Sequence, residues 1–253
     1  FGATYKNKRS CHLTTIGCTS FFPSKPLGCY GDGGAIFTDD EDLAKKIKQI
    51  RAHGQDRRYH HPIVGLNSRL DTLQAAILLA KLEVFEQEIQ DRQRVAKRYA
   101  ESLVGLTEIP YIEPWNMSVY AQYTIAVDDR ERVQKEIEGC GIPTAVHYPI
   151  SLHQQPVFKT LYSSHEKSFP HSERAAARVL SLPMHPYMTD LDQMKVVEAV
   201  AGALKHRHRA GPLPEPGLRP EPAGDGQRAV PPGRLAHRKP AAPATPERRP
   251  GYP

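Results

Sequence analysis

A lysine in a short loop has the most distinctive chemical setting in this 253-residue sequence. Lys25 follows a segment of β-forming residues at 13–20 and lies in a proline-flanked loop, with Ser20 and Ser24 beside it. A lysine amine that is held close to a carbonyl cofactor forms a Schiff base, and serine hydroxyls can bind a phosphate group. A loop lysine is also commonly a solvated surface residue. On spacing alone, both interpretations remain open.

The segments around Lys25 predict how it is positioned. Residues 13–20 favour a strand, a loop follows with a turn at Gly31-Asp32-Gly33-Gly34, and Ala35–Phe37 favours a second short strand. Thr38 and Glu41 have the spacing of a capping box. The apolar residues after it repeat at helical spacing, so we predict a helix over about 40–53 that Gly54 ends.

The rest of the chain to residue 204 predicts one long helix and a second lobe. Apolar residues recur without proline or glycine from Asp71 to about Leu103, which is long enough for a helix that connects two lobes. In the second lobe we predict strands over 119–127, 144–147 and 180–184, and helices over 130–138, 171–180 and 190–204, the last capped by Thr189. This alternation indicates a small α/β layer.

The charge is unevenly distributed along the chain. The net charge is +6, but the ten basic and four acidic residues from Lys205 onward account for all of it, so 24 of each remain in 1–204. Residues 211–253 hold 12 of the 23 prolines and few large apolar residues, which predicts a disordered segment. We favour a frameshift near residue 206 over a flexible tail or a basic interaction tail.

Composition argues against several classes of protein. No apolar run approaches eighteen residues, and the first residues have no apolar signal region, so we expect neither a membrane span nor a signal peptide. The four cysteines lack C-x-x-C spacing and fit a reducing, cytoplasmic compartment. His53, His60 and His61 share a polar loop, but no acid or cysteine completes a ligand set, so we predict no metal site.

Several motifs together resemble one enzyme family. The segment SFFPSKPLGCYGDGGAIFT around Lys25 resembles the active-site lysine segment of the DegT/StrS-type sugar aminotransferases. The resemblance continues in order through RAHGQDRRYHH, GLNSRLDTLQAAIL, AVHYPISLHQQPVF and SLPMHP. It implies a pyridoxal-phosphate (PLP) enzyme with the α/β fold of aspartate aminotransferase. It also implies that glutamate aminates a nucleotide sugar, most similarly a UDP-3-keto-N-acetylhexuronate used for surface polysaccharide.

The resemblance assigns roles to six residues, motif by motif. Lys25 would form the internal aldimine with PLP and then carry the proton between the donor Cα and the cofactor C4′. Ser20 would hold the PLP phosphate, and Asn67 would reach the phosphate of the neighbouring subunit in a homodimer with shared active sites. The residues implied to bind substrate are Arg69, His147 and Tyr148.

Simpler interpretations of three of these residues stay open. Asn67 could instead cap the helix that follows it. Arg69 could be a solvated arginine at the start of that helix, and His147 could be a core histidine with a satisfied hydrogen bond. Two other functions also stay open: the same scaffold acting on another keto-sugar or as a sensor, and a non-catalytic fragment with a basic binding tail.

The resemblance places this chain in the latter part of a larger enzyme. It implies the end of a PLP-binding large domain with the connecting helix at 1–105, a small C-terminal α/β domain at 106–205, and the tail at 206–253. The large domain is therefore an incomplete one. The phosphate loop, the stacking aromatic ring and the Asp that pairs with the pyridine nitrogen are not found in this sequence. We therefore expect the chain as written to bind PLP weakly or not at all. Nothing indicates a nucleic-acid or membrane partner.

Overall fold

The structure, a computed structural model, describes residues 1–161 and 168–205. All the elements below belong to one compact unit of the chain. The predictions for the tail, including the frameshift near residue 206, lie outside the described residues. No helix among the described residues is long and apolar enough to cross a membrane.

A small antiparallel sheet at the start of the chain joins segments that are far apart in the sequence. Strands β1 (Thr4–Tyr5) and β2 (Lys8–Arg9) form a hairpin, and β5 (Asn116–Met117) pairs with the other edge of β1. The two turn residues of the hairpin, Lys6 and Asn7, have φ of 47° and 63°, the left-handed values of a tight hairpin turn. The sequence contains no glycine here, and we did not predict this hairpin.

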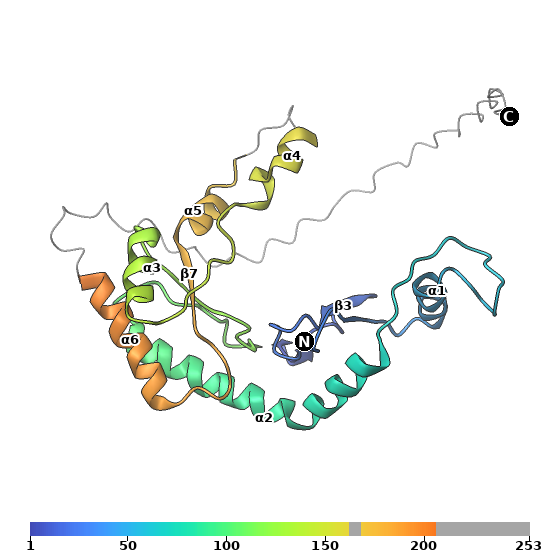
Figure 1. Cartoon of the computed structure of the whole chain (residues 1–253), viewed down its shortest axis with the longest axis horizontal. Coiled ribbons are helices and arrows are strands. Elements are labelled where there is room, and N and C mark those ends of the chain that lie inside the picture. The colour runs from blue at the N-terminus through green and yellow to red at the C-terminus, as the bar shows by residue number, and fades with distance from the viewer. Residues whose placement is uncertain (162–167, 206–253) are drawn as a thin grey trace, which may run out of the picture. The chain divides into compact units, whose positions relative to one another are not determined.

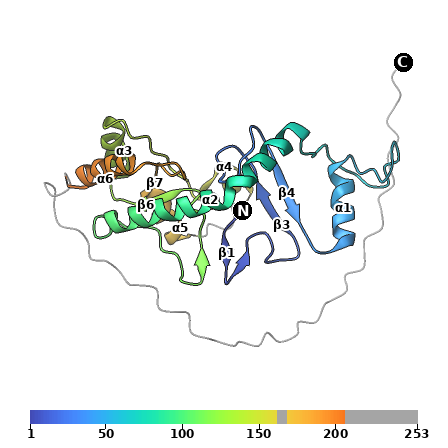
Figure 2. The same ribbon diagram turned by 90° about the horizontal axis from the view of Figure 1, so that it is seen from below.

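The predicted strand–loop–strand around Lys25 is confirmed, with shorter strands. Strands β3 (Gly17–Ser20) and β4 (Gly34–Phe37) run antiparallel, with Ser20 opposite Gly34 (Figure 2). The predicted strand began at residue 13, but the first four residues form bends in which the Thr14 hydroxyl donates to the carbonyl of Ile16 at 2.8 Å. A local side-chain bond of this kind competes with strand pairing.

The predicted helix over about 40–53 is confirmed as α1 (Glu41–Arg51), with a different N-cap. The Asp40 carboxylate accepts a hydrogen bond from the backbone N–H of Leu43 at 2.9 Å and caps the helix. Thr38, which has the spacing of a capping box with Glu41, accepts instead from the N–H of Asp40 at 3.2 Å. It therefore shapes the turn before the cap.

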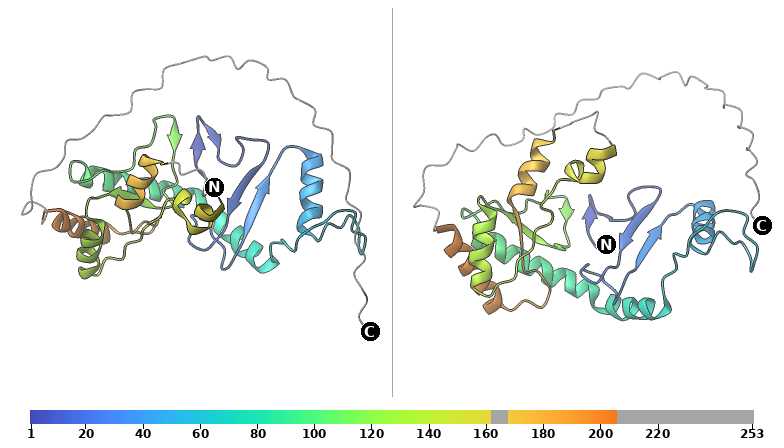
Figure 3. Two further views of the ribbon diagram at one scale, coloured as in Figure 1. Left: turned by 90° about the horizontal axis from the view of Figure 1, so that it is seen from above. Right: turned by 45° about the horizontal axis from the view of Figure 1, so that its top comes forward.

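The predicted long helix is confirmed as α2 (Thr72–Leu103), 32 residues without interruption (Figure 1). Its residues up to Ile89 supply Leu78, Phe85 and Ile89 to one buried cluster, which also contains Phe21, Leu27, Cys29 and Val119. Its second half supplies Val95, Ala96, Tyr99 and Leu103 to another. One helix therefore takes part in both hydrophobic cores, and Figure 3 shows it extending from the β3–β4 pair to the lobe that carries α6. The predicted domain boundary near residue 105 stays a prediction.

The second lobe is built on an antiparallel strand pair. Strands β6 (Tyr123–Ala126) and β7 (Val179–Leu182) pair with Tyr123 opposite Leu182. The predicted strand at 144–147 is wrong as a full strand, because only Ala145 pairs, as an isolated bridge with Ser181. The helices are α3 (Arg130–Gly139), α5 (Pro170–Arg178) and α6 (Asp190–Lys205), and two short elements that we did not predict are the 3-10 helix η1 (Leu152–Gln154) and α4 (Pro156–Leu161).

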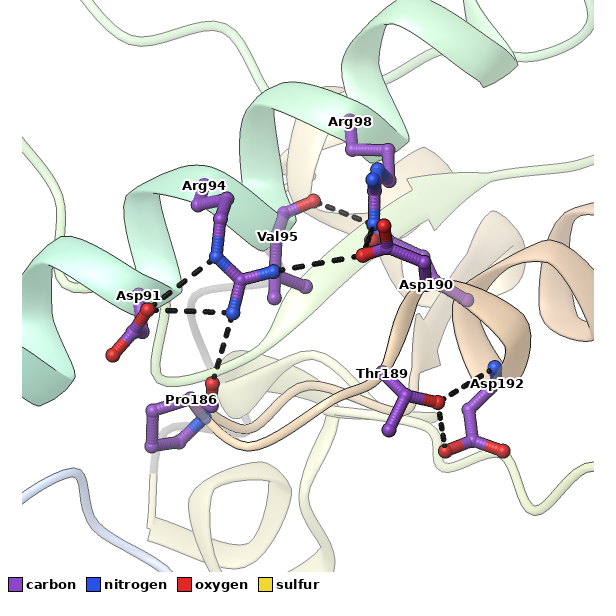
Figure 4. A network of polar contacts seen from close by, with 9 residues as sticks. Asp91, Arg94, Val95, Arg98, Pro186, Thr189, Asp190 and Asp192 are labelled. Atoms are coloured by element: carbon purple, nitrogen blue, oxygen red, sulfur yellow. Dashed lines mark hydrogen bonds and ion pairs between the residues drawn. The ribbon is translucent and has the colours of Figure 1, made fainter.

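The predicted cap of α6 is confirmed. The Thr189 hydroxyl accepts from the backbone N–H of Asp192 at 3.1 Å and donates to its carboxylate at 2.6 Å. Beyond the cap, Asp190 forms ion pairs with Arg94 and Arg98 of α2, and Arg94 also reaches the carbonyl of Pro186 (Figure 4). These contacts join the start of α6 to the second half of α2.

Candidate active site around Lys25

We call Phe21–Gly31 the lysine loop, and backbone hydrogen bonds fix its shape. The N–H of Phe21 donates to the carbonyl of Gly33 at 2.8 Å, which continues the β3–β4 pairing. The N–H of Lys25 donates to the carbonyl of Phe22 at 2.8 Å, the bond of a tight turn. Lys25 thus lies directly on a turn that closes at the end of a strand.

Ser20 is at the base of this turn and faces the same loop. Its hydroxyl oxygen accepts a hydrogen bond from the N–H of Phe22 at 3.2 Å. A serine hydroxyl accepts and donates independently, so this bond leaves the Ser20 proton available for another acceptor. Ser20 is exposed, so a ligand can reach that proton.

The inner side of the lysine loop is anchored by a buried thiol. Cys29 is fully buried, and its Sγ lies 3.0 Å from the carbonyl oxygens of both Phe21 and Gly31. A thiol carries one proton and donates to only one acceptor at a time, so the two carbonyls share it. The backbone N–H of Cys29 also donates to the Phe21 carbonyl at 2.8 Å. Both ends of the loop are therefore tied to one residue.

Close approach of the backbone explains two glycines after the loop. A Cβ added to Gly33 would lie 2.9 Å from the sulfur of Cys29, and one added to Gly34 would lie 2.8 Å from the carbonyl oxygen of Thr19. Both distances are too short for a real side chain, so glycine is required for this turn to pack against β3. The predicted turn at 31–34 is shorter than expected: Gly31 and Asp32 form bends, and Gly34 already belongs to β4. Asp32 takes no part in these close contacts.

The Lys25 side chain is exposed and its amine is free. No hydrogen bond, ion pair or ring contact of Nζ occurs within residues 1–161 and 168–205. Unlike a lysine on a mobile surface segment, Lys25 lies on a loop whose backbone is held at both ends, so its amine has a defined position. The arrangement offers a primary amine to a carbonyl compound, with a hydroxyl donor five residues earlier.

Asn67 and Arg69 lie on a segment that runs along the end of α1. Asn67 forms an isolated bridge with Ala52, and the N–H of Ser68 donates to the carbonyl of Arg51 at 2.9 Å. The N-cap of α2 is Asp71, not Asn67, so the capping alternative for Asn67 is wrong. Both Asn67 and Arg69 are exposed.

Arg69 faces a hollow of about 870 Å³ that the β3–β4 pair and α1 line. Its other lining residues include Cys18, Asp32, Ile47, Lys48 and Arg51. Neither Lys25 nor Ser20 lines this hollow. The structure therefore brings Ser20 and Lys25 together and places Arg69 on a neighbouring surface.

His147 and Tyr148 belong to the second lobe. His147 is half-buried, and its Nδ1 lies 2.9 Å from the hydroxyl of Ser181, which in turn lies 2.9 Å from the hydroxyl of Thr124. His147 therefore has a hydrogen-bond partner on β7, Ser181, as expected if it is a core histidine. Tyr148 is 70% exposed and available to a ligand. Among the described residues, no recorded hydrogen bond joins this pair to the lysine loop.

The histidines of the 53–61 loop have other partners. His60 Nδ1 lies 2.6 Å from the Asp56 carboxylate, and His61 Nδ1 lies 2.8 Å from the carbonyl of His53. The hydrogen bond from His60 holds the pKa of the Asp56 carboxyl below its usual value. In the part of the chain that the structure describes, no three potential metal ligands cluster together.

Two residues of α2 contact the lysine loop and were not singled out from the sequence. Gln74 accepts from the N–H of Tyr30, and Lys81 donates to the carbonyl of Gly28. Their spacing could have pointed to this contact. Gln74 and Lys81 are seven positions apart, so they lie on the same side of the predicted helix as the core residue Leu78 between them. Polar residues on a core-facing stripe indicate a polar partner in the fold.

Fold and site together define an α/β protein that presents an exposed lysine on a fixed loop beside a long connecting helix. The comparison with protein families makes this specific: the chain belongs to the DegT/DnrJ/EryC1/StrS aminotransferase family, whose model matches residues 1–201. Over 199 residues it is 60% identical to the UDP-2-acetamido-2-deoxy-3-oxo-D-glucuronate aminotransferase of Pseudomonas aeruginosa. That match covers 78% of this chain and 54% of the relative.

Solved structures confirm the predicted aspartate-aminotransferase-like fold. A family aminotransferase from Brucella abortus superposes with a TM-score of 0.75 at 39% identity, over 79% of this chain and 54% of that one. NtdA from Bacillus subtilis, a structure with bound cofactor PMP, superposes with a TM-score of 0.70 at 32% identity, over 76% and 46%. The chain thus spans about half the length of the relatives that it matches.

Proposed function

We propose that this chain is the lysine-bearing part of a PLP-dependent aminotransferase that acts on a nucleotide sugar. The amino donor is glutamate and the acceptor is a UDP-3-keto-N-acetylhexuronate, in a cytoplasmic pathway to surface polysaccharide. The observation that carries this proposal is the free amine of Lys25 on a fixed loop, in a chain that is 60% identical to an aminotransferase for such a sugar.

The residues at the loop fit the cofactor. PLP has an aldehyde and a phosphate, and the loop offers a primary amine and a hydroxyl whose proton is available. Lys25 would hold the cofactor through its ε-amine, and Ser20 would donate to a phosphate oxygen. When bound, PLP supplies an electron sink for the negative charge that develops on a substrate carbon.

Lys25 also has the acid–base task of the reaction. With PLP bound and its own amine free, Lys25 would take the proton from Cα of the amino donor on Nζ and hold it for return to the reacting group. A fixed loop suits this task, because proton transfer between two nearby carbons requires the amine to remain within hydrogen-bond reach of both. The hydrogen bonds from Phe21, Lys25 and Cys29 supply that rigidity.

The other predicted residues would bind the acids and the sugar. Arg69 presents a guanidinium, which pairs with a carboxylate through two parallel hydrogen bonds and suits either glutamate or the uronate. Tyr148 and His147 would contact the sugar, and Asn67 would reach the phosphate of the cofactor in a second subunit. This arrangement requires a homodimer, and the exposure of Asn67 supports it.

A chimeric enzyme tests the proposal. Residues 1–201 would replace the matching segment of the P. aeruginosa relative, and amination would be followed with glutamate and three keto-sugars. We expect amination of the UDP-3-keto-N-acetylglucuronate and little reaction with a UDP-3-keto-N-acetylglucosamine or a dTDP-linked 3-keto-sugar. A Lys25→Arg chimera is the matched control and should be inactive. An inactive wild-type chimera that still folds and binds PLP would contradict the proposal.

A further inference from the structure

The lysine loop rests against one stripe of α2. Gln74, Leu78 and Lys81 are spaced at i, i+4 and i+7, so their side chains lie on the same side of the helix. Leu78 is 5% exposed and shares a buried cluster with Leu27 and Cys29 of the loop. The apolar residue at the centre of the stripe therefore packs into the same core as the loop.

The two polar residues of the stripe bind the backbone on the far side of the loop. Gln74 Oε1 accepts from the N–H of Tyr30 at 2.8 Å. Lys81 Nζ donates to the carbonyl of Gly28 at 2.6 Å and lies 5.1 Å from the centre of the Tyr30 ring. A Cβ added to Gly31 would lie 3.1 Å from Gln74 Nε2, which shows how closely loop and helix approach.

Among the described residues, the Gly28 carbonyl and the Tyr30 N–H have no backbone hydrogen-bond partner, and α2 supplies a side-chain partner for each. The N–H of Lys25 closes its own turn, and Cys29 ties the loop to Phe21. Tyr30 as a whole is 74% exposed, yet its N–H is held by a side chain 44 residues away. A charge-assisted bond such as the one from Lys81 is stronger than a neutral one. The position of the second half of the loop thus depends on α2 as well as on Cys29.

We propose that Gln74 and Lys81 are positioning residues that lock the lysine loop onto α2 and so fix the direction in which Lys25 presents its amine. The inference rests on the proposed function for the meaning of Lys25, but the locking itself does not. Because α2 also contributes to the core of the second lobe, a shift of this helix would move the loop with it.

Hydrogen exchange on the full 253-residue chain tests the lock without requiring catalysis. In the wild type the Tyr30 amide should be protected although its ring is exposed. Gln74→Leu removes the acceptor and Lys81→Met removes the donor, and each should speed exchange of the 28–31 amides about three- to tenfold, the effect of one lost hydrogen bond. Gln74→Glu and Lys81→Arg keep an acceptor and a donor and should restore protection.

Two matched controls on the same helix separate the lock from general destabilisation. Gln90→Leu and Lys97→Met change the same residue types at exposed positions away from the loop, and they should leave exchange of 28–31 unchanged. An unprotected Tyr30 amide in the wild type would overturn the proposal, and this measurement needs no variant to fold. Equal exchange in Gln74→Leu and Gln74→Glu would also overturn it.

Borohydride trapping of a PLP adduct on Lys25 tests whether the bonds of Gln74 and Lys81 affect how Lys25 reaches the cofactor. After incubation with PLP and borohydride, the fraction of chains with a reduced adduct at Lys25 is measured by peptide mapping. Gln74→Leu and Lys81→Met should lower that fraction relative to the wild type, and the conservative variants should recover it. Because the isolated chain should bind PLP weakly, this trapping is done in the chimeric enzyme that carries residues 1–201. If even the wild-type chimera gives no adduct, the cofactor role of Lys25 fails, and the exchange result alone decides the lock. Equal trapping in wild type and Gln74→Leu, with faster exchange, would refute the effect on Lys25.

Discussion

Tyr99 and Tyr123 pack against each other in the second core, with ring centroids 4.9 Å apart, yet their hydroxyl groups have opposite situations. The Tyr99 hydroxyl donates to the carbonyl of Pro183 at 3.0 Å. The Tyr123 hydroxyl is buried with no partner among the described residues. One tyrosine on α2 thus contributes a hydrogen bond to the lobe, while its neighbour on β6 carries an unsatisfied polar atom.

This difference predicts opposite effects of the same substitution. Tyr123→Phe removes an unsatisfied buried hydroxyl and should leave the free energy of unfolding unchanged or raise it by about 1 kcal/mol. Tyr99→Phe leaves the Pro183 carbonyl without its donor and should lower it by about 1 kcal/mol. Denaturant unfolding of both variants measures the effects. Equal losses of stability in both would show that Tyr123 has a partner.

Alkaline pH should reveal the burial of Tyr123. Burial, with the Tyr120 ring nearby, raises the pKa of Tyr123 to about 12 from its ordinary value of 10.0. Because the folded pKa is raised, the neutral form is favoured by folding. The associated stability is complete below pH 10 and declines as the pH rises through about 12. The free energy of unfolding, measured between pH 10 and about 12, should therefore fall less steeply with pH in Tyr123→Phe than in the wild type.

Two contacts between α2 and α6 should contribute differently to the free energy of unfolding, and Figure 4 shows one of them, between Asp190 and Arg98. Gln193 is fully buried and donates to the carbonyl of Val95 at 2.6 Å, whereas the side chain of Asp190, which pairs with Arg98, is 67% exposed. Asp190→Asn should cost less than about 1 kcal/mol, because solvent screens exposed ion pairs. Gln193→Glu introduces a buried charge and should cost about 3 kcal/mol or more. Thermal unfolding of the two variants compares them, and similar losses would contradict this ranking.

The 253-residue chain tested alone should bind PLP weakly. It spans about half the length of the relatives that it matches, and Ser20 and Lys25 alone supply few contacts to the cofactor. Absorbance titration with PLP should give a much weaker dissociation constant than the chimeric enzyme gives, and Lys25→Arg should abolish the borohydride-reducible adduct in both. A strong adduct at Lys25 in the isolated chain would disprove this expectation.

The sequence was most informative where local rules dominate. The long helix and the cap at Thr189 were predicted because periodicity and a capping hydroxyl act within a few residues. The motifs around Lys25 also identified the family correctly. An error occurred where two local rules competed: Asp40 displaced Thr38 as the cap of α1. The capping alternative left open for Asn67 is excluded, because the N-cap of α2 is Asp71.

Long-range pairings could not be predicted in the same way. The pairing of β1 with β5 joins residues more than a hundred positions apart, and neither two-residue strand has a pattern of its own. The predicted strand at 144–147 reduced to a single bridge because β7 offers it a partner only at Ser181. Which neighbour a strand finds depends on the assembled sheet, and propensity does not determine it.

The sequence by itself determined that Lys25 lies in a tight loop after a strand, with a serine hydroxyl at hand, because turn residues and strand formers act locally. Only the tertiary structure decided what holds that loop. Gln74 and Lys81 lie 44 and 53 residues from the backbone groups that they bind, and the helix brings them there because Leu78 between them is buried in the same core. Burial of an apolar residue thus sets the partners of its polar neighbours, which no local pattern encodes.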